Sequence, residues 1–521
     1  MPGTHVPARA GVVLTALLMA AAVCNLTTGG ASVALPDIAG TFDAPQTTLN
    51  LVALGTGLGL AMTVLYAGAL GDRYGRVRLL CIGLIGLLIA GTAASLAPTI
   101  EFLMGARVLT GIAAGCAFPT TLALITALWA EGPARVRAIA LWTATGAVAT
   151  VAGSVISGAL VVAFGWRIAL LLPVPVAVVA LLIAARSIPR GVAESDEPVD
   201  HLGGILSVIA VAALVLGLGV VFAPGETGAG AGLIVAAAVL IAAFAARQLR
   251  VAAPLYDLSI ARRRLFWVPA VAGTLAFGAL VGAMFVGQQY LQNILGYDAL
   301  QAGIALIPAA IALLVCAPLA AVLVERGTRM AMIVGYVVLI AAFGTMLAWN
   351  ETTPPVIVAL AFALVGGGAS FVMTAASRSL TSSTPVRRAG MASATSDLQT
   401  DLGGAVMQAL LGAVPAGGFS HVFAGLIAAS PEAASLSDDI TRALQASYAS
   451  AAHVAANNPA YAAHILEAAR LSFVDGAWAA YLVGAIALLL GLIVVGVGLP
   501  GVAVEKELRG RYRDEDALTA P

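Results

Sequence analysis

Residues 68–78 read GALGDRYGRVR, and this short polar segment separates two apolar stretches, 48–70 and 77–97, each long enough to cross a membrane. Its glycines permit a very tight turn. Asp72 can meet the exposed N-terminus of the helix that follows, and the arginines can meet carboxylates or lipid phosphates. A basic loop of no particular function is the alternative, but the spacing G-x-x-G-D-R-x-G-R is too specific for it.

Outward from this segment the chain is mostly apolar. Hydrophobic residues make up 60% of its 521 residues and charged residues 10%, whereas soluble proteins carry roughly 25% charged residues. A helix that crosses a bilayer needs about 20 apolar residues, and the apolar stretches are too long and continuous for barrel strands. We therefore predict an all-α membrane protein with fourteen spans: 11–33, 48–70, 77–97, 101–129, 135–162, 166–187, 202–223, 229–247, 266–291, 299–324, 328–348, 354–378, 388–415 and 473–499.

The distribution of basic residues predicts the orientation. Placing the N-terminus in the cytoplasm leaves 22 of the 26 basic residues in inner loops and tails, as the positive-inside rule expects. Of the other four, Arg107 lies inside a span, and Arg167, Arg442 and Arg470 fall outside. Both termini are then cytoplasmic, in a protein of the plasma membrane. The first stretch, 11–33, has the position of a signal peptide but the length of a span.

One long connection, 416–472, falls on the outer side between the last two spans. Ser437, followed by two aspartates, predicts the start of a capped helix. The sequence Asn457-Asn458-Pro459 predicts a break, and 460–471 predict a second short helix. We expect a helical hairpin above the outer face, with a flexible tether as the alternative. Such a hairpin could contact a partner in the cell envelope.

Other classes of function have little support in the sequence. The formal net charge is zero, which gives no general attraction to nucleic acid. The four cysteines, Cys24, Cys81, Cys116 and Cys316, lie in apolar stretches without a CxxC pair, so we interpret them as buried small side chains. There is no nucleophile–base pair and no nucleotide-binding loop, and we therefore expect no enzyme activity, no metal site and no cofactor.

The segment 68–78 resembles the signature loop of the major facilitator superfamily, which has this pattern at this place. A weaker copy, VERGTR at 324–329, follows the tenth span, and the acids Asp72 and Glu325 lie 253 positions apart. The resemblance implies two six-helix bundles, 11–187 and 266–499, with two inserted linker helices at 202–247. Together with the outer connection 416–472 and a cytoplasmic tail at 500–521, this layout is similar to that of the fourteen-helix drug:proton antiporters.

The same resemblance implies roles for further residues. In the signature loop it implies an inner gate formed by Gly68, Gly71, Asp72, Arg73, Gly75, Arg76 and Arg78. RVLTGIAAG at 107–115 is similar to the family's Arg-x-x-x-Gly helix, whose arginine serves proton coupling; an arginine that reaches to the outer interface is the alternative. The ninth span ends in QQYLQN at 288–293. Its polar side chains either face a solute or join neighbouring helices: Gln288, Gln289, Tyr290 and Gln292.

The chain departs from the family at two places. Family members commonly carry an acid nine positions before the proline of the Leu-Pro that ends the first span, where this chain has Thr27; the neighbouring Asn25 and Thr28 are polar but exchange no proton near neutral pH. These three are candidates for the substrate cavity. The fifth span should read Gly-Pro-x-x-Gly-Gly, but 153–158 read GSVISG and lack the kinking proline. The small residues that remain still allow close helix approach: Gly153, Ser154, Ser157 and Gly158.

Two acidic residues are the candidates for the coupling site. Asp397 and Asp401 are four positions apart in the span 388–415, so they share one helix face, about 13 and 20 Å inward from Arg388. Two close carboxylates in a low dielectric should not both be ionised, which favours a proton carrier or a site for a cation. The alternative is a span that begins at Leu402 and leaves both acids at the inner interface.

The sequence therefore predicts an exporter of small amphipathic or cationic compounds, which works by alternating access and uses the proton gradient through Asp397, Asp401 and Arg107. We expect it to act as a monomer in the lipid bilayer. An exporter of a lipid or a cell-envelope metabolite is one alternative, which the missing acid of the first span and the outer hairpin favour. A membrane sensor or scaffold that transports nothing is another, although the chain has no sizeable soluble domain.

Overall fold

The computed structural model describes residues 10–129, 132–189, 198–251, 253–385, 389–430 and 436–518. Within these residues it contains helices and no strands, and fourteen segments are long and apolar enough to cross a membrane. The prediction of an all-α protein with fourteen spans is confirmed. Four of the arginines used to predict the orientation lie outside the described residues: Arg9, Arg190, Arg387 and Arg388.

Twelve spans are single helices and two are broken ones. The single helices are α1 (Ala10–Phe42), α2 (Gln46–Tyr74), α3 (Arg76–Ser95), α4 (Ile100–Leu128), α5 (Pro133–Phe164), α8 (His201–Val220), α9 (Thr227–Gln248), α11 (Arg264–Asn293), α14 (Thr328–Leu347), α15 (Pro355–Ser382), α16 (Ala389–Ala429) and α19 (Ala462–Gly498). The broken spans pair α6 (Trp166–Leu171) with α7 (Pro173–Ser187), and α12 (Ala299–Ile304) with α13 (Ile307–Glu325). In both pairs a proline lies in the first turn of the second helix, where its missing N–H costs no hydrogen bond.

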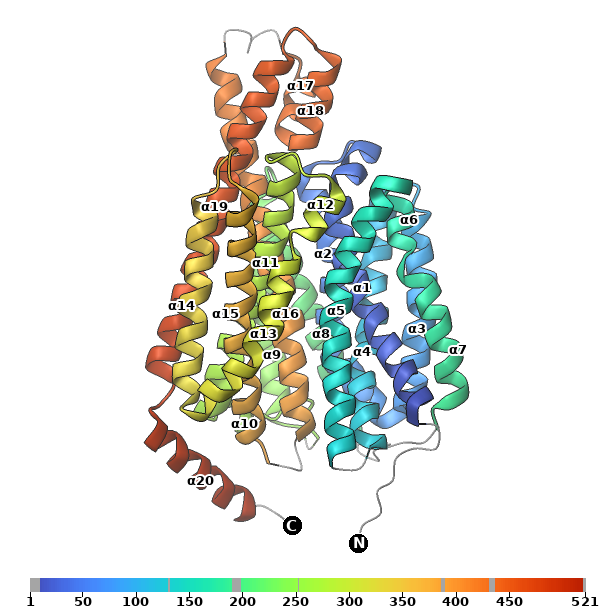
Figure 1. Cartoon of the computed structure of the whole chain (residues 1–521), viewed down its shortest axis with the longest axis vertical. Helices are drawn as coiled ribbons and strands as arrows, with labels where there is room; N and C mark the ends of the chain where they lie inside the picture. The colour runs from blue at the N-terminus through green and yellow to red at the C-terminus, as the bar shows by residue number, and fades with distance from the viewer. Residues whose placement is uncertain are drawn as a thin grey trace.

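The spans gather into two halves (Figure 1). The first half consists of α1 to α7, and the second of α11 to α16 with α19. The inserted helices α8 and α9 pair with each other, and α8 packs against both α2 and α16. The start of α1 and the helix α20 (Val502–Leu518) lie at one end of the molecule, the terminal face. The short helices α17 (Asp438–Ala446) and α18 (Tyr448–Asn457) stand at the other end, the hairpin face.

The two loops that resemble each other in sequence turn in the same way. Gly75 joins α2 to α3 with φ 103°, and Gly327 joins α13 to α14 with φ 144°. Both values lie in the region that favours glycine, because a side chain there would be strained. The matching turns support the internal repeat that the sequence indicates.

The most extensive contacts between the two halves are along two pairs of helices, which we call the seam. In α5 and α12, a Cβ atom added to Gly158 would collide with the carbonyl oxygen of Ala299, so the two backbones touch. In α2 and α16, Nδ2 of Asn50 donates to the carbonyl oxygen of Gly412 at 2.6 Å. The helix α8 covers the second of these pairs, because it contacts both of its members.

The hairpin face differs from the prediction because the spans on both sides of it are longer than expected, with α16 ending at Ala429 and α19 beginning at Ala462. The helix α17 begins after Ser437, whose Oγ accepts from the N–H of Ile440 at 3.3 Å, and α18 ends at Asn457, as predicted. The prediction of a separate short helix over 460–471 is wrong, because residues 462–471 lie in α19, which continues unbroken to Gly498. No proline or glycine occurs in 462–475, so nothing ends the helix of the last span there.

Candidate functional site

Asp397 and Asp401 lie on the side of α16 that faces the first half. Gln399, between them, points the other way and donates from Nε2 to two carbonyl oxygens of α11 at 2.7 and 2.8 Å. With 3.6 residues per turn, each aspartate is about 160° around the helix from Gln399. That is the side on which Gly412 accepts from Asn50 of the first half. Both carboxyl groups are therefore directed towards the seam.

The carboxylates have few partners. Oδ1 of Asp401 accepts from Oγ1 of Thr400 at 3.5 Å, and its Oδ2 is buried without a hydrogen bond. No basic side chain pairs with either aspartate in the part of the chain that the structure describes. The helix α16 starts at Ala389, not at Leu402, and both acids lie within its candidate span. Such a pair can accept a proton or a cation.

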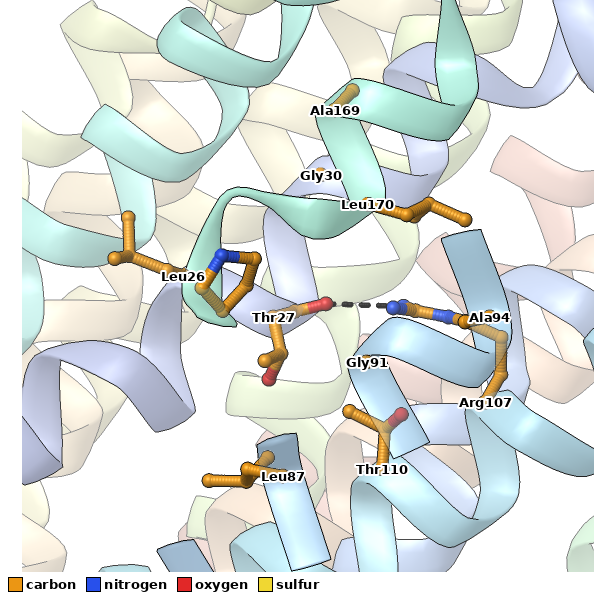
Figure 2. Close-up of a pocket in the computed structure, with 11 residues that line it drawn as sticks. Leu26, Thr27, Gly30, Leu87, Gly91, Ala94, Arg107, Thr110, Ala169 and Leu170 are labelled. Carbon is orange, nitrogen blue, oxygen red and sulfur yellow. Dashed lines mark hydrogen bonds between the residues drawn. The ribbon is translucent and has the colours of Figure 1, made fainter. Parts of the chain in front are cut away.

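Arg107 of α4 is buried, with 3% of its surface exposed, and does not extend to an interface. Its Nη2 donates to the backbone carbonyl oxygen of Thr27 in α1 at 3.0 Å, as Figure 2 shows. Its Nε is buried and has no partner among the described residues. Position 27 is where the family resemblance implies an acid, so the structure brings the two positions together although the acid is missing.

Asn25 and Thr28 do not lie on the side of α1 from which Thr27 contacts Arg107. Oδ1 of Asn25 accepts from Oγ1 of Thr150 in α5 at 3.1 Å. Thr28 is exposed although it lies in the middle of its helix. Because α1 is packed by α2, α4, α5 and α7 of its own half, its exposed side faces the other half. Thr28 would therefore line a cavity between the two halves.

The small residues of α5 pack against two helices. Cβ atoms on Gly29 and Gly30 of α1 would each lie 2.6 Å from a serine Oγ of α5. Of the residues that replace the family's motif, Gly153, Ser154 and Ser157 pack against α1. Gly158 packs against α12 of the other half, and the backbone of Ser154 also contacts Gly303 of α12. Residues 153–158 therefore let α5 approach both α1 and α12 closely, although the proline is missing.

The polar side chains at the end of α11 have separate surroundings. Oε1 of Gln289 accepts from Nε2 of Gln46 in α2 at 2.6 Å, which joins the two halves. Tyr290 is buried in an aromatic cluster of the second half. Nε2 of Gln292 donates to the carbonyl oxygen of Gln288 at 3.4 Å. Nε2 of Gln288 is buried and has no hydrogen bond to any described residue.

Sequence reasoning missed two residues of α2 that belong to the seam, Gln46 and Asn50. Nε2 of Gln46 donates to Oδ1 of Asn50 at 2.9 Å as well as to Gln289. A signal was present in the sequence, because Asn50 is the only amide side chain in the stretch 48–70. An amide inside a span is costly unless another helix supplies a hydrogen-bond partner.

The signature loop ties three helices together. Asp72 pairs with Arg76, the first residue of α3, with 2.7 Å between Oδ1 and Nη2. Nη1 of Arg76 also donates to the carbonyl oxygen of Ala123 in α4 at 3.1 Å. Around this pair, the loop has buried glycines at Gly71 and Gly75, a half-buried Gly68, and exposed arginines at Arg73 and Arg78.

Comparisons with known proteins agree on one family. The family model described as Major Facilitator Superfamily matches residues 17–408. The chain is 30% identical over 499 residues to the multidrug efflux pump LfrA of Mycolicibacterium smegmatis, a match that covers 95% of this chain and 97% of that protein. It is 27% identical to the tetracenomycin C resistance and export protein of Streptomyces glaucescens, over 95% of this chain and 93% of that protein.

Solved structures share the fold at low sequence identity. A bacterial homologue of the human lysosomal transporter Spinster superposes with a TM-score of 0.64 at 15% identity, over 95% of this chain and 98% of that one. A peptide transporter in complex with sulfate superposes with a TM-score of 0.61 at 14% identity, over 95% and 98%. These likenesses concern the arrangement of helices alone.

Proposed function

The chain belongs to the Major Facilitator Superfamily, and from this we propose that it exports small amphipathic or cationic compounds by proton antiport. That it is a membrane transporter of small molecules, and not an enzyme, follows from the family. Drug efflux is supported by relatives that are named a multidrug efflux pump and a tetracenomycin C resistance and export protein. Coupling to protons is supported by the geometry of α16.

The observation that carries the proposal is the pair Asp397 and Asp401 on the side of α16 that faces the seam. Holding both carboxylates charged in a low dielectric is costly, and the described residues supply no basic partner. A proton or a cationic substrate relieves this cost, and either one reduces the attraction for the other. Competition for one site is what couples the outward movement of a substrate to the inward movement of protons.

The contacts along the seam indicate how access alternates. At the hairpin-face end of α2, the hydrogen bonds from Gln46 to Gln289 and from Asn50 to Gly412 hold the halves together. These bonds break when the halves part on that side, and the signature loop at the terminal face acts as the gate of the other side. We place the terminal face in the cytoplasm because most basic residues fall on that side of the chain. The protein works as a monomer in this account.

The test is transport in proteoliposomes with an imposed pH gradient and a panel of amphipathic cations. We expect the double variant Asp397→Asn with Asp401→Asn to lose the part of the flux that the pH gradient drives, by at least about tenfold. The amide is close in size to the carboxyl group but cannot release a proton. The substitution therefore removes the charge and the proton exchange, and it leaves contacts to neutral groups in place. The matched control is Asp438→Asn with Asp439→Asn, because these two aspartates are exposed in α17.

Two results would contradict the proton role. One is gradient-driven flux in the Asp397/Asp401 double variant equal to that of the control. The other is a wild-type flux that does not respond to the pH gradient for any compound of the panel.

A further inference from the structure

Arg107 is a buried cation that has no counter-charge among the described residues. Its one hydrogen bond to a described residue is to a neutral carbonyl oxygen, that of Thr27, and its Nε has no partner in the described residues. A guanidinium group stays protonated in proteins. A buried charge is strongly unfavourable unless a charge of opposite sign lies next to it. The described residues therefore do not balance the charge of Arg107.

The described side chains around Arg107 supply no negative charge. Oγ1 of Thr27 donates to the carbonyl oxygen of Cys24 at 2.6 Å, and Oγ1 of Thr110 donates to that of Ala106 at 2.8 Å. Both hydroxyl groups are therefore satisfied within their own helices. Among the described residues, no carboxylate forms an ion pair with Arg107.

A pocket lies beside the guanidinium group (Figure 2). Arg107 is its charged lining residue, and Thr27 and Thr110 contribute two hydroxyl groups. The remaining walls are glycine or apolar and include Leu26, Leu87, Ala94, Leu170 and Pro173. All lining residues come from α1, α3, α4, α6 and α7, so the pocket lies inside the first half and not on the seam.

We infer that this pocket binds a small monovalent inorganic anion, chloride under ordinary conditions. Nε–H of Arg107 is the donor left over for it, and the apolar walls favour a weakly hydrated anion over a multiply charged one. The bound anion takes the place of the carboxylate that the family resemblance implies at position 27. Because the pocket lies apart from Asp397 and Asp401, the anion is a structural component of the first half and is not transported.

The site makes a specific prediction about position 27. In Thr27→Asp the chain carries its own carboxylate next to Arg107, so the anion is no longer needed. We expect wild-type protein, purified in detergent, to have an apparent melting temperature about 4 °C higher in sodium chloride than in sodium gluconate at the same ionic strength and pH. In Thr27→Asp the difference should disappear, with the melting temperature in gluconate raised towards that in chloride.

The control and the direct observation follow from the same geometry. Thr28→Asp introduces the same group one residue along, at an exposed position, and should keep the dependence on chloride. Arg107→Gln should lose it; if that variant does not fold, Thr27→Asp alone decides the test. In crystals grown with bromide, anomalous scattering should place an ion beside Arg107.

Three results would overturn the inference. The first is a wild-type melting temperature that is the same in chloride and in gluconate. The second is a dependence on chloride in Thr27→Asp as large as in the wild type. The third is bromide density elsewhere in the protein with none at Arg107. None of these outcomes depends on proton antiport, because each is measured without transport.

Discussion

At the scale of residues, glycines determine how closely α2 and α4 approach. A Cβ atom on Gly59 would collide with the carbonyl oxygen of Val108, and one on Gly111 would collide with that of Thr56. Backbones in contact gain dispersion energy that lipid-facing side chains cannot supply. The glycine of the Arg-x-x-x-Gly motif is therefore required for the packing of α4 against α2.

We expect Gly111→Ala to lower the apparent melting temperature of the detergent-solubilised protein by about 5 °C, because overpacking typically costs about 1–3 kcal/mol. Gly105→Ala in the same helix is the matched control, since no atom of the described residues lies within 4 Å of the added Cβ. Both variants carry the same change in helix propensity. Equal melting temperatures for the two variants would show that the α2–α4 contact is not tight.

Individual residues also show which features of the site could be predicted from the sequence. Asp397, Asp401 and Arg107 stand out because charges inside apolar stretches are costly. Arg107 and Thr27 are 80 positions apart in the sequence, so no local sequence pattern could predict their contact. Which side of α16 the aspartates face could not be predicted either, because this depends on how Gln399 packs against α11.

At the scale of elements, the helix α18 connects the two halves at the hairpin face. It lies in the connection between α16 and α19 of the second half. Oγ of Ser450 in α18 donates to Oδ1 of Asp43, between α1 and α2 of the first half, at 3.3 Å. If the halves part on this side during transport, this contact has to break.

A disulfide between these positions tests that requirement. In a background without the four native cysteines, we expect Asp43→Cys with Ser450→Cys to form a disulfide under mild oxidation and to stop transport. Reduction should restore the flux. The single variants, oxidised in the same way, are the controls. A cross-linked protein that transports at the uncross-linked rate would mean that α18 does not separate from the first half.

The boundaries of elements were less predictable than their number. The first span was expected to end near residue 33, but α1 continues through Pro36 to Phe42, and α16 continues to Ala429. Hydropathy reports where a helix meets lipid, and a helix can continue into water as long as its backbone hydrogen bonds do. The same reason accounts for the short helix wrongly expected before the last span.

At the scale of the whole molecule, the repeat seen in sequence corresponds to matching turns in structure. Gly75 and Gly327 both adopt positive φ at the joint between the second and third spans of their halves. The number of spans and the family followed from the apolar pattern and from the signature loop. The seam did not, because Gln46, Asn50 and Gly412 come together only when the two halves pack.

The central claim for the whole molecule is that substrate and protons move in opposite directions through one site. The most direct measurement records both fluxes together in proteoliposomes that enclose a pH-sensitive dye, with a substrate gradient and no initial pH gradient. Substrate leaving the vesicles should drive protons inward, so that the interior acidifies, and Asp397→Asn with Asp401→Asn should abolish this pH change. Substrate flux with no pH change in the wild-type protein would contradict proton antiport.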